Sequence, residues 1–426
     1  MEKAEGFELF ELHYSDLLIL SSDYVQSPSS SPAELQRLDI VKRHIMETLG
    51  PMGPGLLSVS GVPNYSVLRH CLPLARNLAL LDSDQRNRIL KDNKLGSDVP
   101  LKNPCRNVSS FAMQLRYFEK NSNSGGDLLF NDRAKEFESL GSDLTELGFF
   151  MMELGLRLAR VCDSAIGGRE LEQSLLESRA SKGRLIHYHS KLDTRLLLKH
   201  SAKKKRGNSK HEQKRKQAHD EPGASKACSG LDLWQQWHYD YGIFTILTAP
   251  LFLLQKIEEE EEDELMESRH EECGYPNGHT CLQIYDRNKK GIFMANSSPE
   301  NFIIQVGESA EVLSKGKLRA TLHSVSRPGK YENLSRETFV VFLQPAWDKV
   351  LCISGYPMKC LSLEDRCLNL LTSEEEEEEG FGERIEEIEK IVPPLSSRLK
   401  DGMTFAEFSR ETTRQYYGGS GLQSNR

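Results

Sequence analysis

Seven short segments rich in Ile, Val, Phe and Thr lie between residues 183 and 345, and they limit the possible fold more than any other feature. Gly, Pro, Asn or charged stretches separate them. This composition and spacing are typical of β-strands joined by turns. Seven such strands in about 160 residues predict a sandwich, a jelly roll or a barrel. The segments are RLIHYHS, GIFTILTAPLFLL, CLQIYDR, GIFMA, NFIIQVG, LRATLHSV and ETFVVFLQP.

Helical patterns flank the strand region. In PAELQRLDIVKRHIMETLG, apolar residues recur at helical spacing until Gly50, a common stop signal. A short strand is expected in GLLSVSGVP, followed by helical patterning over residues 64–90 that Pro73 bends or restarts. A longer helix starts near Ser142, and a last one is expected in MTFAEFSRETTRQYY, ending at Gly418. The longer helix has an apolar stripe that we expect to face the core: Leu147, Phe150, Met151, Leu154, Leu158 and Cys162.

The net charge of -8 comes from three segregated runs. Residues 201–220 carry +6, whereas residues 257–273 and residues 374–389 carry -9 each, so the rest of the chain is at -8 + 18 - 6 = +4. Blocks of like charge repel themselves and bury little apolar area, which predicts mobile, solvated loops. The basic run also resembles a two-part nuclear localisation or nucleic-acid patch. It lacks the interleaved aromatic residues that stack on single-stranded bases.

The remaining composition bears on the compartment. No segment approaches the roughly 18 consecutive apolar residues of a membrane span, and the start MEKAEGFELFELHYSD does not resemble a secretory signal. The nine cysteines are odd in number and scattered, which argues against a disulfide framework. We therefore expect a protein of a reducing compartment, either the cytoplasm or, if the basic run is a localisation signal, the nucleus. No membrane partner is expected.

A candidate metal site combines His238 and Asp240, which lie just before the predicted strand GIFTILTAPLFLL, with a histidine from a later segment. In extended chain, His238 and Asp240 leave the same face, so one segment presents two ligands to one cation. His323 lies in LRATLHSVSRP, another predicted strand. Two histidines and one carboxylate match the facial triad of non-haem iron(II) oxygenases, which leaves coordination positions open. Arg336 and Thr338 share a face of a further strand, and a guanidinium with a hydroxyl is a good receptor for a carboxylate.

These motifs, in this order, resemble the plant-type 2-oxoglutarate and Fe(II)-dependent dioxygenases, the isopenicillin N synthase-like family. The resemblance covers most of the chain outside the charged runs. It includes the segment METLGPMGPGLLSVSGVP, which is similar to an N-terminal helix-strand element of the family. The matching positions are His238, Asp240, Tyr241, Gly242, Thr245, Leu247, Leu282-Gln283-Ile284-Tyr285-Asp286, Val306-Gly307-Glu308, Arg319-Ala320-Thr321-Leu322-His323-Ser324-Val325 and Arg336-Glu337-Thr338.

The resemblance implies a distorted double-stranded β-helix (jelly roll) core, mainly β with flanking helices. His238, Asp240 and His323 would hold Fe(II), and Arg336 and Thr338 would bind the cosubstrate 2-oxoglutarate. Tyr188 stands where the family has an Asn-Tyr-Tyr-Pro element and is a further candidate cosubstrate contact, although Ile186-His187-Tyr188-His189-Ser190 departs from that pattern. The implied activity uses O2, with ascorbate as an auxiliary reductant. It oxidises, by hydroxylation in the first instance, a small organic substrate with release of succinate and CO2.

The sequence leaves one alternative function open, a catalytically silent family member that acts as a binding or scaffold module through its charged inserts. An intact triad and both anchor residues favour the enzyme. We expect a monomer with residues 1–182 packing on the core, residues 183–345 forming the oxygenase core with inserts 201–220 and 257–273, and residues 346–426 forming a C-terminal extension. A protein or nucleic-acid partner rests only on the basic insert.

Overall fold

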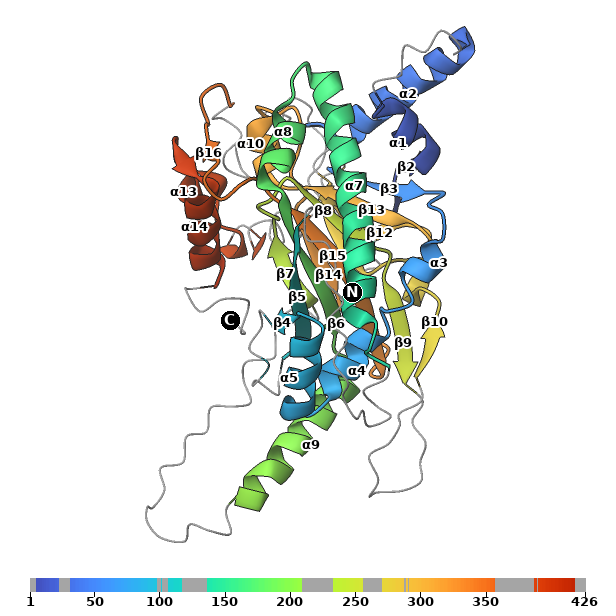
Figure 1. Cartoon of the computed structure of the whole chain (residues 1–426), viewed down its shortest axis with the longest axis vertical. Coiled ribbons are helices and arrows are strands. Elements are labelled where there is room, and N and C mark those ends of the chain that lie inside the picture. Colours follow the sequence, from blue (N-terminus) through green and yellow to red (C-terminus); the bar gives the residue numbers. More distant parts are fainter. Residues whose placement is uncertain are drawn as a thin grey trace, which may run out of the picture.

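The structure is a computed structural model that describes residues 5–22, 31–97, 101, 106–116, 136–208, 233–255, 270–286, 289, 291–356, 387–388 and 390–417. Within these residues the protein is mainly β, with helices packed around two mixed sheets (Figure 1). No helix in this described part is long and apolar enough to cross a membrane.

The smaller sheet carries the two candidate histidine ligands. Its strands follow the order β1-β12-β11-β14-β7, and all neighbours are antiparallel except the parallel pair β1 and β12. The first residues of the chain therefore complete a sheet whose other strands come from its second half. The strands are β1 (Gly6–Glu8), β12 (Gly291–Asn296), β11 (Leu282–Asp286), β14 (His323–Ser326) and β7 (Leu233–His238).

The larger sheet carries the candidate cosubstrate residues on β15 and β6. Its order is β2-β3-β13-β8-β15-β6-β5-β4, and β9 pairs with both β15 and β10. One end of β15 pairs with β9 and the other with β8, so β15 lies at a fork in the sheet. The strands are β2 (Glu11–His13), β3 (Leu56–Ser60), β13 (Phe302–Val306), β8 (Phe244–Thr248), β15 (Leu334–Leu343), β6 (Ala180–Tyr188), β5 (Val108–Arg116), β4 (Gly96–Ser97), β9 (Leu251–Gln255) and β10 (His270–Cys273).

The two sheets enclose an apolar interior. One buried cluster joins Ile284 and Val325 of the smaller sheet to Ile186, Leu247 and Val340 of the larger one. Because side chains alternate between faces, the neighbouring residues of the larger sheet point outward into a second cluster under the long helix α7. This arrangement of two facing sheets is the predicted double-stranded β-helix.

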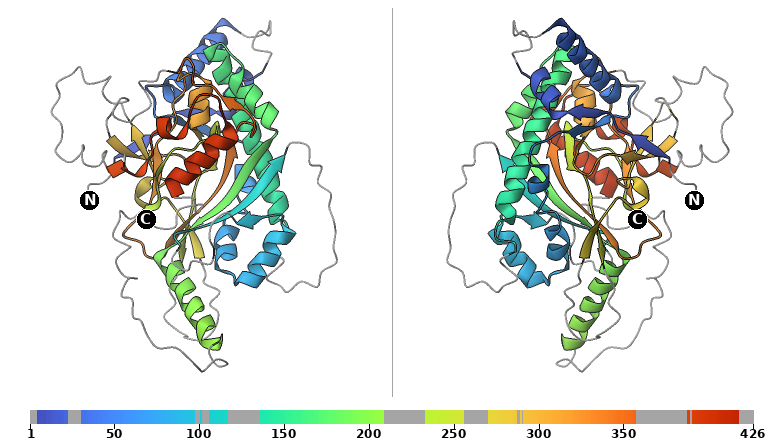
Figure 2. Two further views of the ribbon diagram at one scale, coloured as in Figure 1. Left: turned by 90° about the vertical axis from the view of Figure 1, so that its left-hand side faces the viewer. Right: turned by 90° about the vertical axis from the view of Figure 1, so that its right-hand side faces the viewer.

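The helix α7 (Leu140–Ile166) covers the outer face of the larger sheet (Figure 2). Its predicted stripe is confirmed, with Phe150 partly buried and the other five residues buried. Gly155 lets it approach closely, since a Cβ there would lie 2.0 Å from a methyl carbon of Leu343. The other helices are α1 (Tyr14–Leu20), α2 (Pro32–Leu49), α3 (Tyr65–Leu68), α4 (Leu74–Leu80), α5 (Ser83–Asp92), α8 (Glu170–Ser178), α9 (Lys191–Asn208), α10 (Glu308–Leu313), α13 (Leu395–Arg398) and α14 (Phe405–Tyr417), with a 3-10 turn at Pro276–Gly278.

Most predicted elements are confirmed. Helix α2 ends at Leu49 with Gly50 as its C-cap, and Pro73 restarts the helical region as the N-cap of α4. Six of the seven predicted strand segments form strands over most of their length, with GIFTILTAPLFLL split into β8 and β9. The seventh, LRATLHSV, becomes a strand only at His323, because Arg319 and Thr321 donate their backbone N–H groups to Leu49 and Val306 instead. A short pair of strands, β16 (Val350–Leu351) and β17 (Met403–Thr404), precedes α14.

The prediction that all three charged runs are loops is wrong where the structure describes them. Residues 201–208 continue α9, which projects from the body (Figure 1), and His270–Cys273 form β10 against β9. Glu387 and Ile388, at the end of the third run, are helical. Helix α9 forms because Ser190 and Asp193 make a reciprocal capping box and its first turns are rich in Leu. The rest of the runs lies outside the described residues.

Candidate functional site

His238 and His323 meet at the ends of two antiparallel strands. His238 is the last residue of β7 and His323 the first residue of β14, and the two are direct partners in the strand register. Their ring centroids are 4.2 Å apart, and both side chains are buried. Two imidazoles from positions 85 residues apart in the chain are thus placed beside one another.

Hydrogen bonds to the backbone orient both rings. His238 Nδ1 lies 2.8 Å from the carbonyl oxygen of Gln236, and His323 Nδ1 lies 3.1 Å from that of Thr321. If each Nδ1 carries the proton and donates it, each Nε2 keeps a lone pair. Both Nε2 atoms face the Asp240 carboxylate at 3.8 Å, one toward each oxygen. Ligating histidines are typically held in this way by a partner on the other nitrogen.

Asp240 lies in the turn after β7 and is held from two sides. The Thr245 hydroxyl donates to Asp240 Oδ2 at 2.7 Å, and the Glu308 N–H donates to the Asp240 carbonyl at 2.8 Å. Gly307 packs directly under this turn, where a Cβ would lie 2.3 Å from the Gly242 carbonyl oxygen and 3.0 Å from that of Asp240. These contacts explain why the matching motifs contain Gly242, Gly307 and Thr245, because each of them fixes the turn that carries Asp240.

The three side chains fit a divalent transition metal. One ligand atom from each of His238, Asp240 and His323 lies within 4.8 Å of the other two. Burial and the neighbouring His323 lower the pKa of His238 to about 4, so that ring is neutral at pH 7 and has a lone pair to give. Two imidazoles and one carboxylate suit Fe(II) while leaving positions for other ligands.

Arg336 lies in the same barrel interior with unused hydrogen-bonding capacity. It is 2% exposed, and its Nε donates to the Thr280 carbonyl at 3.2 Å. Its Nη1 is buried without a hydrogen-bond partner among the described residues. Burying an unpaired guanidinium donor is costly, which points to an anionic ligand at this position.

Tyr188 lies beside Arg336, as their pairing in the register of β6 and β15 requires. The guanidinium carbon of Arg336 is 5.0 Å from the centre of the Tyr188 ring. The predicted companion Thr338 shares the face of Arg336, but its hydroxyl donates to the Thr248 carbonyl at 3.2 Å. To reach a ligand held by Arg336, the Thr338 hydroxyl has to turn away from Thr248.

Gln235 connects the two halves of the site, and the sequence did not single it out. Tyr188 Oη donates to Gln235 Oε1, and Gln235 Nε2 lies 2.9 Å from His238 Nε2. A regular strand would put residues 235 and 238 on opposite faces. The register between β7 and β14 shifts at this point, with Val325 opposite Gln235, and this irregularity brings Gln235 to the site.

Comparisons with known proteins match the fold. No family model matches the chain, and neither does any curated protein sequence. Among solved structures, a full-length Neurospora crassa protein in complex with α-ketoglutarate and thymine is 13% identical, with a TM-score of 0.50 over 97% of this chain and 98% of that one. JOX2 in complex with 2-oxoglutarate, iron and JA is 14% identical, with a TM-score of 0.48 over 94% and 84%. The chain therefore has the double-stranded β-helix fold of 2-oxoglutarate oxygenases.

Proposed function

We propose that this protein is a 2-oxoglutarate- and Fe(II)-dependent dioxygenase. The observation that carries the proposal is the convergence of His238, Asp240 and His323 in one barrel interior with the unpaired Nη1 of Arg336. The fold shared with solved 2-oxoglutarate oxygenases and the ordered sequence motifs support it.

In this proposal, each residue has a separate task. His238 Nε2, His323 Nε2 and one Asp240 oxygen would hold Fe(II). Arg336 would bind the distal carboxylate of 2-oxoglutarate through its free Nη1, with Thr338 as a second donor and Tyr188 as the wall beside it. When bound, Fe(II) supplies the oxidising chemistry with O2 and 2-oxoglutarate, releasing succinate and CO2. The surrounding apolar cluster would exclude water from the reacting groups.

The substrate would be a small organic molecule, and the reaction a hydroxylation in the first instance. Related folds have been solved with thymine and with JA bound. Ascorbate would serve as an auxiliary reductant. The described core lies within the mildly positive part of the chain, which suits an anionic cosubstrate.

The larger organisation belongs to the same proposal. Residues 183–345 would be the catalytic core of a monomer, with residues 1–182 and 346–426 packed around it. The chain would act in the cytoplasm, or in the nucleus if residues 201–220 are a localisation signal. That basic run would also be the place for any protein or nucleic-acid partner.

A turnover screen tests the proposal. Protein loaded with Fe(II) under anaerobic conditions is mixed with O2, 2-oxoglutarate and fractions of a metabolite extract, and succinate is measured. We expect Fe(II)-dependent succinate formation that at least one fraction stimulates and that His323→Ala abolishes. Full activity of His323→Ala would refute the assignment of the site. Binding of 2-oxoglutarate without any stimulated turnover would instead favour the silent binding module.

A further inference from the structure

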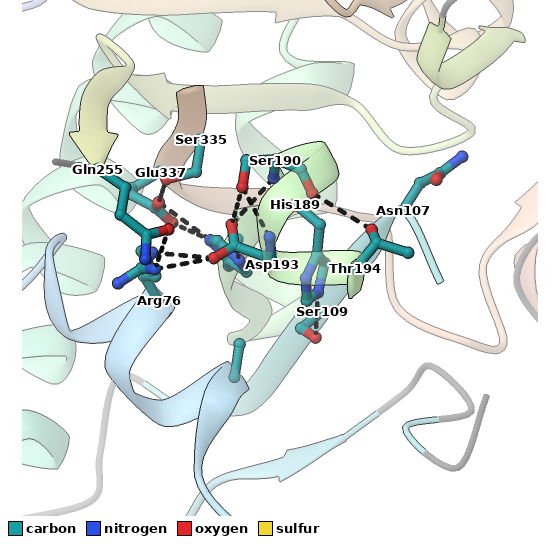
Figure 3. A network of polar contacts seen from close by, with 12 residues as sticks. Arg76, Asn107, Ser109, His189, Ser190, Asp193, Thr194, Gln255, Ser335 and Glu337 are labelled. Atoms are coloured by element: carbon teal, nitrogen blue, oxygen red, sulfur yellow. Dashed lines mark hydrogen bonds and ion pairs between the residues drawn. The ribbon is translucent and has the colours of Figure 1, made fainter. Parts of the chain in front are cut away.

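A second buried polar cluster includes Arg76, Asp193 and Glu337 (Figure 3). It lies on the outer face of β6, next in the strand register to the candidate cosubstrate residues. His187 Nδ1 lies within hydrogen-bond distance of both oxygens of Glu337, at 2.9 and 3.0 Å. His187 Nε2 lies 3.5 Å from Asp193 Oδ2, which is ion-pair distance without a hydrogen bond. Arg76 donates from Nε and Nη2 to the other Asp193 oxygen. The cluster thus links β15, β6, the first turn of α9 and α4.

The carboxylates that face His187 outnumber the cation that pairs with them, which favours a positive charge on the ring. Asp193 and Glu337 contribute two negative charges and Arg76 one positive charge, and these side chains and His187 are at most 4% exposed. Both nitrogens of His187 face carboxylates, so a neutral ring would aim a lone pair at one of them. His189, whose ring packs against that of His187, is kept neutral because burial, His187 and the guanidinium groups of Arg106 and Arg327 lower its pKa well below its usual value, although Asp193 opposes them. A proton on each nitrogen of His187 balances the cluster.

A metal ion is the rival occupant, because His187, His189 and Asp193 also lie within reach of one ion. The Asp193 carboxylate, however, is already held by four hydrogen bonds, which a metal ion would have to displace and the ion-pair contact with His187 leaves in place. Its Oδ1 accepts two hydrogen bonds from Arg76, and its Oδ2 accepts from the N–H and the hydroxyl of Ser190 in the capping box of α9. A proton therefore fits the cluster better than a cation does.

The strand register connects this cluster to the interior of the barrel. Glu337 pairs with His187 directly beside the pair formed by Arg336 and Tyr188. Glu337 and His187 point outward, while Arg336 and Tyr188 point inward. The Ser335 hydroxyl also donates to Glu337 Oε1 at 2.8 Å, which fixes the carboxylate from its own strand. Arg336 is thus adjacent in β15 to a carboxylate that is held from behind the sheet.

We propose that His187, protonated on both nitrogens, is a positioning residue that holds Glu337 and thereby aims Arg336 at the cosubstrate. This inference rests on the proposed function, since it assigns His187 a part in 2-oxoglutarate binding. His187 touches neither cosubstrate nor metal. Its effect is expected in the affinity for 2-oxoglutarate rather than in the chemical step.

Glu337→Gln tests the inference, because it keeps the shape of the side chain and removes the charge. We expect the KM for 2-oxoglutarate to rise about tenfold, which corresponds to about 1.4 kcal/mol, with kcat changed less than about twofold. Asp163→Asn is the matched control, since Asp163 is a buried carboxylate that caps α8 through the N–H groups of Leu171 and Glu172. The proposal would be overturned if the KM for 2-oxoglutarate rose equally in both variants, or if it rose in neither.

Nitrogen-15 NMR of the histidine side chains of the full chain gives an independent readout. We expect the wild type to show an imidazolium signal for His187 at pH 7.5. In Glu337→Gln, the His187 ring should become neutral at a lower pH than in the wild type. A neutral ring in the wild type would overturn the proposal. Zinc binding at this cluster would also overturn it. In that case the double variant His238→Ala, His323→Ala would retain one equivalent of Zn²⁺, and adding His189→Gln would abolish that binding. If the wild type binds no 2-oxoglutarate, the proposed function fails too, whereas binding that Glu337→Gln leaves unchanged overturns only this inference.

Discussion

His238 and His323 are direct register partners on two antiparallel strands, with ring centroids 4.2 Å apart. Replacing His323 by Ala removes one of three ligands and leaves both strands intact. We expect the affinity for Mn²⁺, a stand-in for Fe(II), to fall by more than the roughly 10- to 100-fold that loss of an outer-shell partner costs. Equilibrium titration measures it. His70→Ala, at an exposed histidine that contacts Asp143, serves as the control and should bind as the wild type does.

Gln235 competes with a metal for His238. Its amide nitrogen lies 2.9 Å from His238 Nε2, the atom that would ligate, so metal binding has to break that hydrogen bond. We expect Gln235→Leu to tighten Mn²⁺ binding by about fivefold, in line with about 1 kcal/mol for one net hydrogen bond. The same titration checks it. Weaker binding would mean that Gln235 orients His238 instead of competing for it.

Gly307 sets the position of the Asp240 turn. A Cβ at this position would lie 2.3 Å from a backbone oxygen, which cannot give way as a flexible side chain does. We expect Gly307→Ala to cost about 1 to 3 kcal/mol in the free energy of unfolding and to weaken metal binding by displacing Asp240. Urea unfolding and Mn²⁺ titration measure the two effects. Gly168→Ala is the control, because a Cβ there meets nothing within 4 Å, and it should leave metal binding unchanged.

Because His187 is charged in the folded protein, we expect the free energy of unfolding to fall at high pH. Although burial opposes its charge, Glu337 and Asp193 together raise the pKa of His187 to about 9, above the usual 6.5. A group with a raised folded-state pKa stabilises fully below its unfolded pKa, so this contribution is present below about pH 6.5 and disappears as pH rises through 9. At about 1.4 kcal/mol per pKa unit it amounts to about 3 kcal/mol. Urea unfolding between pH 6 and 10 measures it, and a Glu337→Gln curve with the same slope would contradict the assignment.

Local sequence patterns predicted much of the fold and the residues that meet at the candidate metal site. His323 lies in a segment predicted as a strand, and Arg336 directly precedes another, whereas β7, which carries His238, was not among the predicted strand segments. The structure brings His238, Asp240 and His323 together, and Arg336 is buried as well. Those predictions worked because strand alternation decides which side chains share a face. The roles of these residues come from the resemblance and stay a prediction, because spacing alone does not assign them.

Other features depend on pairings that no local pattern reveals. Gln235 reaches the site through a shift in strand register, and β1 joins its sheet next to β12, nearly 300 residues later. The partnership of His187 and Glu337 requires knowing that β6 pairs with β15. The start of α9, in contrast, was readable from the sequence, since Ser190-x-x-Asp193 is a capping box.

Calorimetric titration of 2-oxoglutarate into anaerobic protein tests the central claim most directly. With Fe(II) bound, we expect one equivalent to bind the wild type. Binding should be much weaker without the metal, and about 100-fold weaker in Arg336→Met, because a buried charge-assisted hydrogen bond is worth about 1.5 to 3 kcal/mol. Absence of Fe(II)-dependent binding to the wild type, or equal affinity in Arg336→Met, would contradict the claim that this barrel is a 2-oxoglutarate site.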